Sequence, residues 1–148
     1  MYRHILIPTD GSELAHKAVV HGLLLAKAVG ARVTTLTIES SFNIYDVPAS
    51  KENLMSAAFE EHARQAGAQG ALILNRVAGE AKTAGVQCEI VQIIQDHPYE
   101  AIVATAKEKG CDLIVMASHG RSGIAAIVLG SVTAKVLAHT TTPVLVCR

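Results

Sequence analysis

Two stretches of this chain place glycine beside hydroxyl-bearing residues in a pattern suited to holding an anion. Ser118–Gly120 follows the apolar run Leu113–Ala117, and Gly130 with Ser131 opens the segment SVTAKVLAH. A helix that starts after such a glycine-bearing turn has free backbone N–H groups at its first turn. The helix dipole favours negative charge there, and glycine lets a phosphate approach the main chain. The pattern predicts a nucleotide or phosphate ligand.

The composition is aliphatic and electrically balanced. Hydrophobic residues make up 50% of the 148 residues, but only 3% are aromatic, so Val, Ile, Leu and Ala must build the core. Such a core is typical of a parallel sheet covered by helices. Lys plus Arg and Asp plus Glu number 13 each, and the basic residues are scattered. We therefore expect neither a nucleic-acid partner nor attraction to an anionic membrane.

Cys88, Cys111 and Cys147 are far apart and each lies in or beside an apolar run. They form no CxxC pair, so we expect buried, reduced thiols and no zinc site. The histidines show no metal-binding spacing either. The N-terminal residues lack the apolar region of a signal peptide and contain no run long enough to cross a bilayer. These features predict a cytoplasmic protein without a bound metal of its own.

Blocks of apolar residues alternate with helical patterns along the chain. The five expected strands are His4–Pro8, Arg32–Ile38, Gln87–Ile94, Asp112–Ala117 and Pro143–Cys147. The expected helices are Ser12–Val29, Lys51–Ala84 as one long helix or two joined ones, Pro98–Lys109 and Ser131–His139, with a polar loop at Glu39–Ser50. This order predicts one α/β domain, residues 1–148, with a parallel sheet and helices on both faces.

Ligands of such sheets bind outside the carboxyl ends of the strands. The two strongest turn signals, Thr9–Ser12 and Ser118–Gly120, both follow predicted strands. If the first and fourth strands are neighbours, these two turns face each other across one crevice.

Four motifs occur in a fixed order: IPTDGS at Ile7–Ser12, MASHGR at Met116–Arg121, GSV at Gly130–Val132 and PVLV at Pro143–Val146. In these motifs, and over essentially its full length, the chain resembles the universal stress proteins. The resemblance implies a Rossmann-like, open parallel five-stranded sheet of order 3-2-1-4-5. It also implies a homodimer through the last strand, whose apolar residues we expect at an exposed sheet edge, namely Val144, Leu145 and Val146.

The ATP-binding branch of that family carries the pattern G-x2-G-x9-G-[ST]. Gly120 and the Gly130-Ser131 pair match its last two elements, while Ala117 replaces the first glycine. The Ala117 methyl either crowds the nucleotide or, on an ordinary β backbone, leaves room for it. Asp96 stands where many relatives carry glycine, and a carboxylate close to a triphosphate is unfavourable.

The resemblance also assigns roles to single residues. Asp10 reaches the ribose or adenine, or else only closes its turn or caps the next helix. Ile38 packs on the adenine, or is an ordinary core residue. Ser131 donates to phosphate, or serves as the helix N-cap. The implied nucleotide-binding residues are Pro8, Thr9, Asp10, Ile38, Met116, Ala117, His119, Gly120, Arg121, Gly130, Ser131 and Val132.

Three functions follow from these assignments. The first is a stress-response regulatory module that binds ATP, with Mg²⁺ held mainly by the phosphates and water. The second is a nucleotide-free relative that acts through protein interactions. The third, a slow ATP hydrolase, has the least support, because the sequence has no Walker lysine. His119 also lacks a Ser or Cys nucleophile with a third orienting residue, so we expect no catalytic residues.

Overall fold

A computed structural model of the protein describes residues 1–41, 52–121 and 129–148. Its strands form one parallel sheet in the order β3-β2-β1-β4-β5, which confirms the predicted fold class and strand order. Their bounds are β1 His4–Pro8, β2 Arg32–Glu39, β3 Cys88–Ile94, β4 Leu113–Ala117 and β5 Val144–Cys147.

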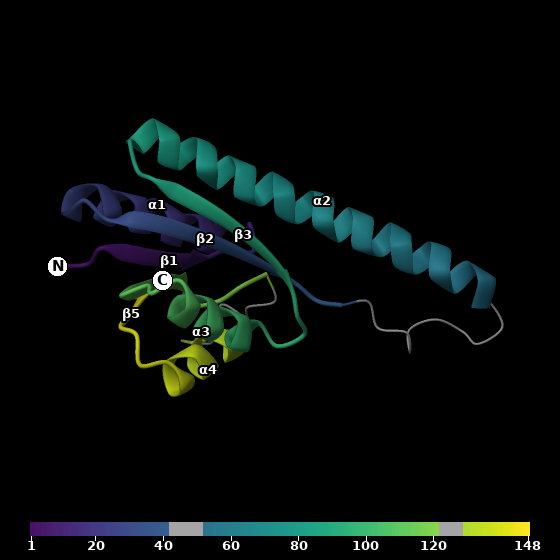
Figure 1. Cartoon of the computed structure of the whole chain (residues 1–148). Helices are drawn as coiled ribbons and strands as arrows, with labels where there is room; N and C mark the ends of the chain where they lie inside the picture. Colours follow the sequence, from purple (N-terminus) through teal and green to yellow (C-terminus); the bar gives the residue numbers. More distant parts are fainter. Residues whose placement is uncertain (42–51, 122–128) are drawn as a thin grey trace.

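The helices α1 and α2 cover one face of the sheet, and α3 and α4 cover the other (Figure 1). The segment predicted as one or two helices is the single helix α2, 33 residues long. Its N-terminal half extends beyond the sheet (Figure 1). The helix bounds are α1 Glu13–Val29, α2 Glu52–Ala84, α3 Pro98–Glu108 and α4 Ser131–His139.

The predicted element bounds need small corrections. β2 includes Glu39, so the predicted loop starts one residue later, and its residues 42–50 lie outside the described residues, as does residue 51. The strands β3, β4 and β5 each begin one residue after the predicted start. Pro143 has no N–H to donate to a strand ladder, although its carbonyl accepts from Ile114. Ser12 precedes α1 as its N-cap, because its side chain accepts from the Ala15 N–H.

The central strands β1 and β4 are buried along their whole length. Ile5 and Ile7 of β1 pack toward α1 and α2, whereas Leu6 packs toward α3 and α4. Burial on both faces explains why these strands read as continuous apolar runs and not as alternating ones. This packing fixes the carboxyl ends of β1 and β4 side by side.

The three cysteines are free thiols among the described residues. Cys111 and Cys147 are buried as predicted, whereas Cys88 is only partly buried. Burial raises the pKa of Cys111 to about 11. The Cys111 side chain is therefore a neutral core group at physiological pH.

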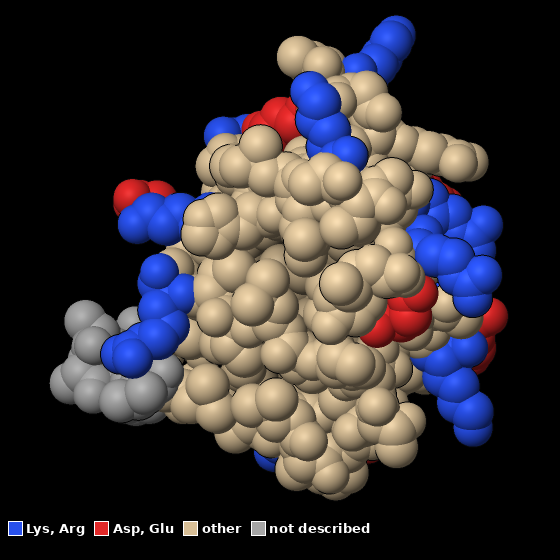
Figure 2. Space-filling view, turned by 90° about the vertical axis from the view of Figure 1, so that its left-hand side faces the viewer, with Lys and Arg blue, Asp and Glu red and all other residues tan. Residues whose placement is uncertain are grey.

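Charged side chains stand mostly around the margin of the face that carries the N-terminus, with both signs present (Figure 2). The middle of that face is uncharged (Figure 2).

Over the part of the chain that the structure describes, no helix combines the length and the apolar character needed to span a bilayer.

Asp112 joins the amino ends of the two central strands. Its carboxylate accepts the backbone N–H of Arg3 at 2.9 Å and that of His4 at 3.0 Å, while its own N–H donates to the His4 carbonyl at 2.9 Å. Partial burial acts to raise the pKa of Asp112, but the hydrogen bonds from His4 and Arg3 outweigh it and hold the pKa below the ordinary value of 3.8. Asp112 therefore stabilises the fold in its ionised form.

We expect Asp112→Asn to lower the free energy of unfolding by about 1 kcal/mol at neutral pH, because the charged acceptor is lost. A depressed pKa contributes stability that is complete above the unfolded-state value and is lost as pH falls through the folded-state value. The difference between wild type and variant must therefore shrink below about pH 4. Urea unfolding at neutral and acid pH measures it.

Glu108→Gln is the control for this experiment, since Glu108 is exposed and no described side chain pairs with it. It should change the free energy of unfolding by less than about 0.5 kcal/mol at either pH. A difference between wild type and Asp112→Asn that stays constant from neutral to acid pH would contradict the assigned role.

Candidate functional site

The turns after β1 and β4 meet at the carboxyl ends of these strands, as predicted. The Asp10 carboxylate accepts the Ser12 N–H at 2.9 Å within its own turn and the Arg121 N–H at 2.8 Å from the other. Asp10 thus performs the turn-closing role and also links two segments that lie far apart in the chain. We call these two turns, together with the start of α4 at Gly130–Val132, the β1–β4 edge.

Gly120 lies close to the Asp10 carboxylate. A methyl group placed on Gly120 would lie 2.7 Å from Oδ2 of Asp10, so this carboxylate, which accepts from Ser12 and Arg121, would have to shift. The side chain of Arg121 turns back over the first turn, where Nη2 would lie 3.6 Å from a methyl on Gly11. The structure therefore brings Asp10, Gly120 and Arg121 together.

The first turn of α4 has no side-chain cap. Gly130 is its N-cap residue, so the alternative role predicted for Ser131 was wrong by one position. The Gly130 N–H donates to the Ser118 carbonyl at 2.7 Å, and the Gly130 carbonyl accepts from Ala134 at 3.0 Å. Within the described residues, the N–H groups of Ser131, Val132 and Thr133 have no protein acceptor. These are the amides that can hold an anion at this edge.

Thr133 fixes the position of this helix start. Its buried hydroxyl lies 2.9 Å from the carbonyl of Ala117 and 3.2 Å from that of Ser118, and it donates to these oxygens. No role was predicted for Thr133 from the sequence, although a hydroxyl residue two positions after Gly-Ser was a visible signal. The Thr133 side chain therefore fixes the first turn of α4 to the end of β4.

Ala117, which replaces the first glycine of the ATP-binding pattern, has ordinary backbone geometry. None of the described non-glycine residues has a positive φ. Ala117 is the last residue of β4 and packs in the core between the sheet and α1 and α2. Its methyl group therefore lies on the face of the sheet opposite α4. The sequence left open whether this methyl crowds a nucleotide or leaves room for it, and the structure favours the second alternative.

Three predicted nucleotide-binding residues share one apolar cluster on the α4 side of the sheet. Met116 is buried in this cluster, while Ile38 and Val132 are partly buried against it. Pro8 and Thr9 are buried where β1 ends, and the Thr9 N–H donates to the Leu36 carbonyl at 2.8 Å. The structure thus brings the predicted adenine-side and phosphate-side residues to the same end of the sheet.

Asp96 is engaged away from the phosphate side. Its carboxylate accepts the N–H of Ser41 at 2.9 Å and the Ser41 hydroxyl at 2.6 Å, and these hydrogen bonds lower the pKa of Asp96. It follows β3, and β2 and β1 separate β3 from β4. Three strand spacings place the end of β3 about 14 Å from that of β4. The predicted conflict between Asp96 and a triphosphate at α4 is correspondingly reduced.

His119 lies beside Gly130 and pairs with its neighbour. Its Nδ1 atom is 2.9 Å from the Ser118 hydroxyl, and its Nε2 atom is buried without a partner among the described residues. Ser118 is itself only 2% exposed, so its hydroxyl is not accessible as a nucleophile. This pair was not predicted, because the sequence of two adjacent residues does not indicate whether their side chains are in contact.

A second pair joins Cys147 Sγ to His21 Nδ1 at 3.6 Å, across 126 positions of sequence. Burial raises the pKa of Cys147, so the side chain is a thiol and not a reactive thiolate. Over the described residues, no group of three or more His, Cys, Asp or Glu side chains is placed to hold a metal ion.

Gly130→Ala should lower the free energy of unfolding by about 1–2 kcal/mol, because the added methyl would lie 2.8 Å from the Ser118 carbonyl oxygen, a backbone atom that cannot move freely. The matched control is Gly79→Ala in α2, where a methyl meets nothing within 4 Å. That substitution should raise stability by about 0.5–1 kcal/mol. Equal effects of the two substitutions in urea unfolding would refute this packing.

Comparison with known proteins agrees with the fold and the motifs. The model of the universal stress protein family matches residues 1–148. Universal stress protein YxiE of Bacillus subtilis is 33% identical, with 100% of both chains covered. The solved structure of Methanocaldococcus jannaschii MJ0577 is similar with a TM-score of 0.76 at 29% identity, covering 99% of this chain and 96% of that one.

A second solved structure is that of a universal stress protein in complex with cAMP. It has a TM-score of 0.72 and 27% identity to this chain, covering 99% of this chain and 97% of that one. Family motifs, strand order and whole-chain similarity all agree. The protein belongs to the universal stress protein family.

Proposed function

We propose that this protein is a regulatory module that binds an adenine nucleotide, ATP with Mg²⁺, at the β1–β4 edge. The observation that carries the proposal is the uncapped start of α4, where the N–H groups of Ser131 and Val132 have no acceptor among the described residues. Free amides at the positive end of a helix dipole are a site for phosphate. The cAMP complex of a relative supports the adenine assignment.

The other groups at this edge fit a nucleotide. Ile38 and Met116 offer an apolar surface for a base on the side of the sheet where α4 begins. Arg121 is exposed beside the same edge and can meet phosphate charge. Mg²⁺ would be held by phosphate oxygens and water, the ligands it prefers. The buried, unpaired Nε2 atom of His119 gives this edge a further polar group in need of a partner.

A nucleotide-free function through protein interactions is the second candidate. It is favoured because two N–H groups at this edge already have acceptors within the protein and are not available to phosphate. The Gly130 N–H donates to the Ser118 carbonyl, and the Arg121 N–H donates to the Asp10 carboxylate. ATP hydrolysis has less support, because the same Asp10 carboxylate is held by two backbone N–H groups in a structural role. We therefore propose a non-enzymatic protein.

Mg-ATP should raise the melting temperature of the wild type by several degrees, since ligand at about 100 times its Kd adds about 2.7 kcal/mol. Gly130→Asp should abolish the shift, because its carboxylate caps the free amides of α4 and repels phosphate. Gly130→Ala adds the same Cβ atom without the charge and should keep part of the shift. Thermal melts with ATP, AMP, cAMP and GTP make the measurement.

Two outcomes contradict the nucleotide site. A wild type that shows no shift with any adenine nucleotide at about 5 mM favours the nucleotide-free function. Equal shifts in Gly130→Asp and Gly130→Ala would show that the nucleotide binds elsewhere. Phosphate release by the wild type over hours would instead support the hydrolase.

We also propose that the protein forms a homodimer through β5. This strand lies at the edge of the sheet, and Leu145 at its centre is 42% exposed. Its neighbours Val144 and Val146 are only partly buried. An apolar edge strand with unpaired backbone groups is a surface for pairing with a second chain.

Leu145→Lys should convert the dimer to a monomer at about 10 μM, because a charge in an apolar strand pair is unfavourable. Leu72→Lys is the control, since Leu72 is 67% exposed on α2, which packs over β2 and β3 on the far side of the sheet from β5, and it should leave the dimer intact. Sedimentation velocity distinguishes the two states. A monomeric wild type, or a dimeric Leu145→Lys variant, would overturn the proposal.

A further inference from the structure

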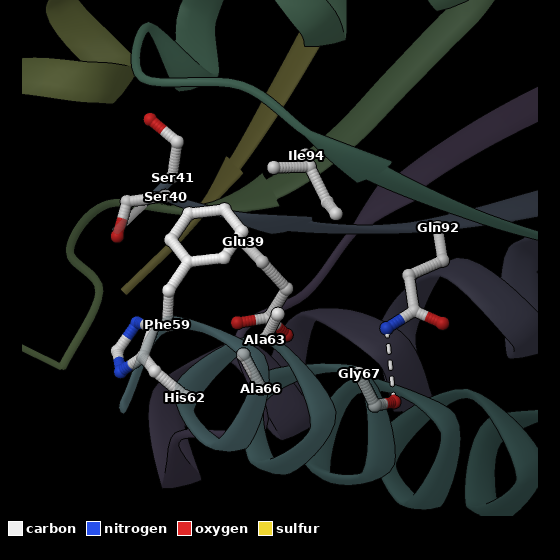
Figure 3. Close-up of a pocket in the computed structure, with 10 residues that line it drawn as sticks. All are labelled: Glu39, Ser40, Ser41, Phe59, His62, Ala63, Ala66, Gly67, Gln92 and Ile94. Atoms are coloured by element: carbon white, nitrogen blue, oxygen red, sulfur yellow. Dashed lines mark hydrogen bonds between the residues drawn. The ribbon is translucent and has the colours of Figure 1, made fainter. Parts of the chain in front are cut away.

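A cavity of about 340 Å³ lies between the protruding half of α2 and the ends of β2 and β3 (Figure 3). Its volume is that of a small-molecule site. One wall comes from α2, and the opposite wall comes from the last residues of β2, the residues after it, and β3. The residues that line it are Glu39, Ser40, Ser41, Phe59, His62, Ala63, Ala66, Gly67, Gln92 and Ile94.

This cavity is separate from the β1–β4 edge. None of the residues predicted to bind nucleotide lines it. Ile38 and Glu39 are consecutive in β2, so their side chains point to opposite faces of the sheet. Ile38 packs on the α3 and α4 side, whereas Glu39 lines the cavity under α2. The two sites therefore share a strand end but not a face.

Small residues of α2 make room for polar side chains on the sheet. A methyl group on Gly70 would lie 2.8 Å from Oε1 of Glu39 and would also collide with the Gln92 amide. The Gln92 Nε2 donates instead to the Gly67 carbonyl at 3.0 Å, which ties β3 to the helix. Glycine on this face of α2 thus lets the Glu39 and Gln92 side chains lie directly against the helix.

The Glu39 carboxylate is the acidic group among the described residues that line this cavity. Figure 3 shows it directed toward α2 beside Ala63, with the Phe59 ring in the same hollow. No lysine or arginine is among the described residues that line the cavity, and no described group forms a hydrogen bond or ion pair with this carboxylate. Glu39 is partly buried, and the described lining also includes the apolar side chains of Phe59, Ala66 and Ile94 and the imidazole of His62. At a pH where imidazoles are neutral, the carboxylate is the charged group that a cation in this cavity can pair with.

We propose that this cavity binds a small organic cation, a primary or secondary amine with an apolar body. The ammonium group pairs with the Glu39 carboxylate, which also accepts its hydrogen bonds. The apolar body packs against Phe59, Ala66 and Ile94, and the aromatic ring of Phe59 adds a favourable cation contact. Organic anions are rejected by the same carboxylate.

The test compares three probes of similar shape: phenethylamine, 2-phenylethanol and 3-phenylpropanoate. Protein NMR titrations at about pH 8, where imidazoles are neutral, follow the amides of Ala66 and Gly67 without added nucleotide. Phenethylamine should give saturable shifts with a Kd of about 1 mM, at least about tenfold tighter than the alcohol. Phenylpropanoate should not bind.

Three variants locate the interaction. Glu39→Gln keeps the shape of the side chain and should erase the preference for the amine over the alcohol. Ala66→Leu fills the cavity with a good helix former and should weaken binding of phenethylamine by about tenfold or more. Glu60→Gln is the control, because Glu60 is exposed on the same helix but does not line the cavity, and it should leave the Kd unchanged.

The proposal is overturned if phenethylamine gives no saturable shifts up to about 10 mM, or if the alcohol or the carboxylate binds equally well. It is likewise overturned if Glu39→Gln retains the preference for the amine, or if Ala66→Leu binds as the wild type does. The nucleotide proposal is unaffected by these results, because the titrations contain no nucleotide and the variants lie off the β1–β4 edge.

Discussion

The parallel pairing of β1 with β4 at the centre of the sheet is the constraint on which the site depends. Both strands are buried along their length, so helices must cover both faces. Once the pair is fixed, the turn that carries Asp10 and the turn that carries Gly120 leave the sheet at the same edge. The start of α4 is held there by Thr133, whose hydroxyl donates to the end of β4. The free amides of α4 are thus a consequence of strand pairing.

Aspartate carboxylates connect the segments that this sheet brings together. Asp112 binds the backbone of β1 at the amino end of the sheet, and Asp10 binds the backbone after β4 at the carboxyl end. Asp96 does the same between the residues after β3 and those after β2. Each carboxylate accepts backbone N–H groups from a segment that is distant in the sequence. Hydrogen bonds to a charged acceptor are among the stronger ones. These carboxylates stabilise the loops by binding backbone N–H groups. A polar residue at the end of a strand is therefore weak evidence for a bound ligand.

The end of β2 presents different chemistry on its two faces. Ile38 belongs to the apolar cluster beneath α4, and Glu39 faces the cavity beneath α2. The face under α4 combines apolar groups with free amides and suits a base attached to phosphate. The face under α2 combines apolar groups with one carboxylate and suits a cation. A single step along the strand therefore separates the proposed anion site from the proposed cation site, and the two lie on opposite faces of the sheet.

The sequence by itself determined the β-α alternation, the parallel sheet and the meeting of the two turns, because continuous apolar runs, Pro98 and the glycine turns act over a few residues. The family motifs supplied the strand order and the candidate nucleotide residues. Only the tertiary structure decided that the Ala117 methyl faces α1, that Gly130 and not Ser131 is the N-cap, and that Asp96 binds Ser41. It alone revealed the cavity at Glu39, whose lining comes from residues as far apart as Phe59 and Ile94. The direction of a side chain and its long-range contacts depend on how helices and strands pack together. The spacing of residues along the sequence does not specify that packing.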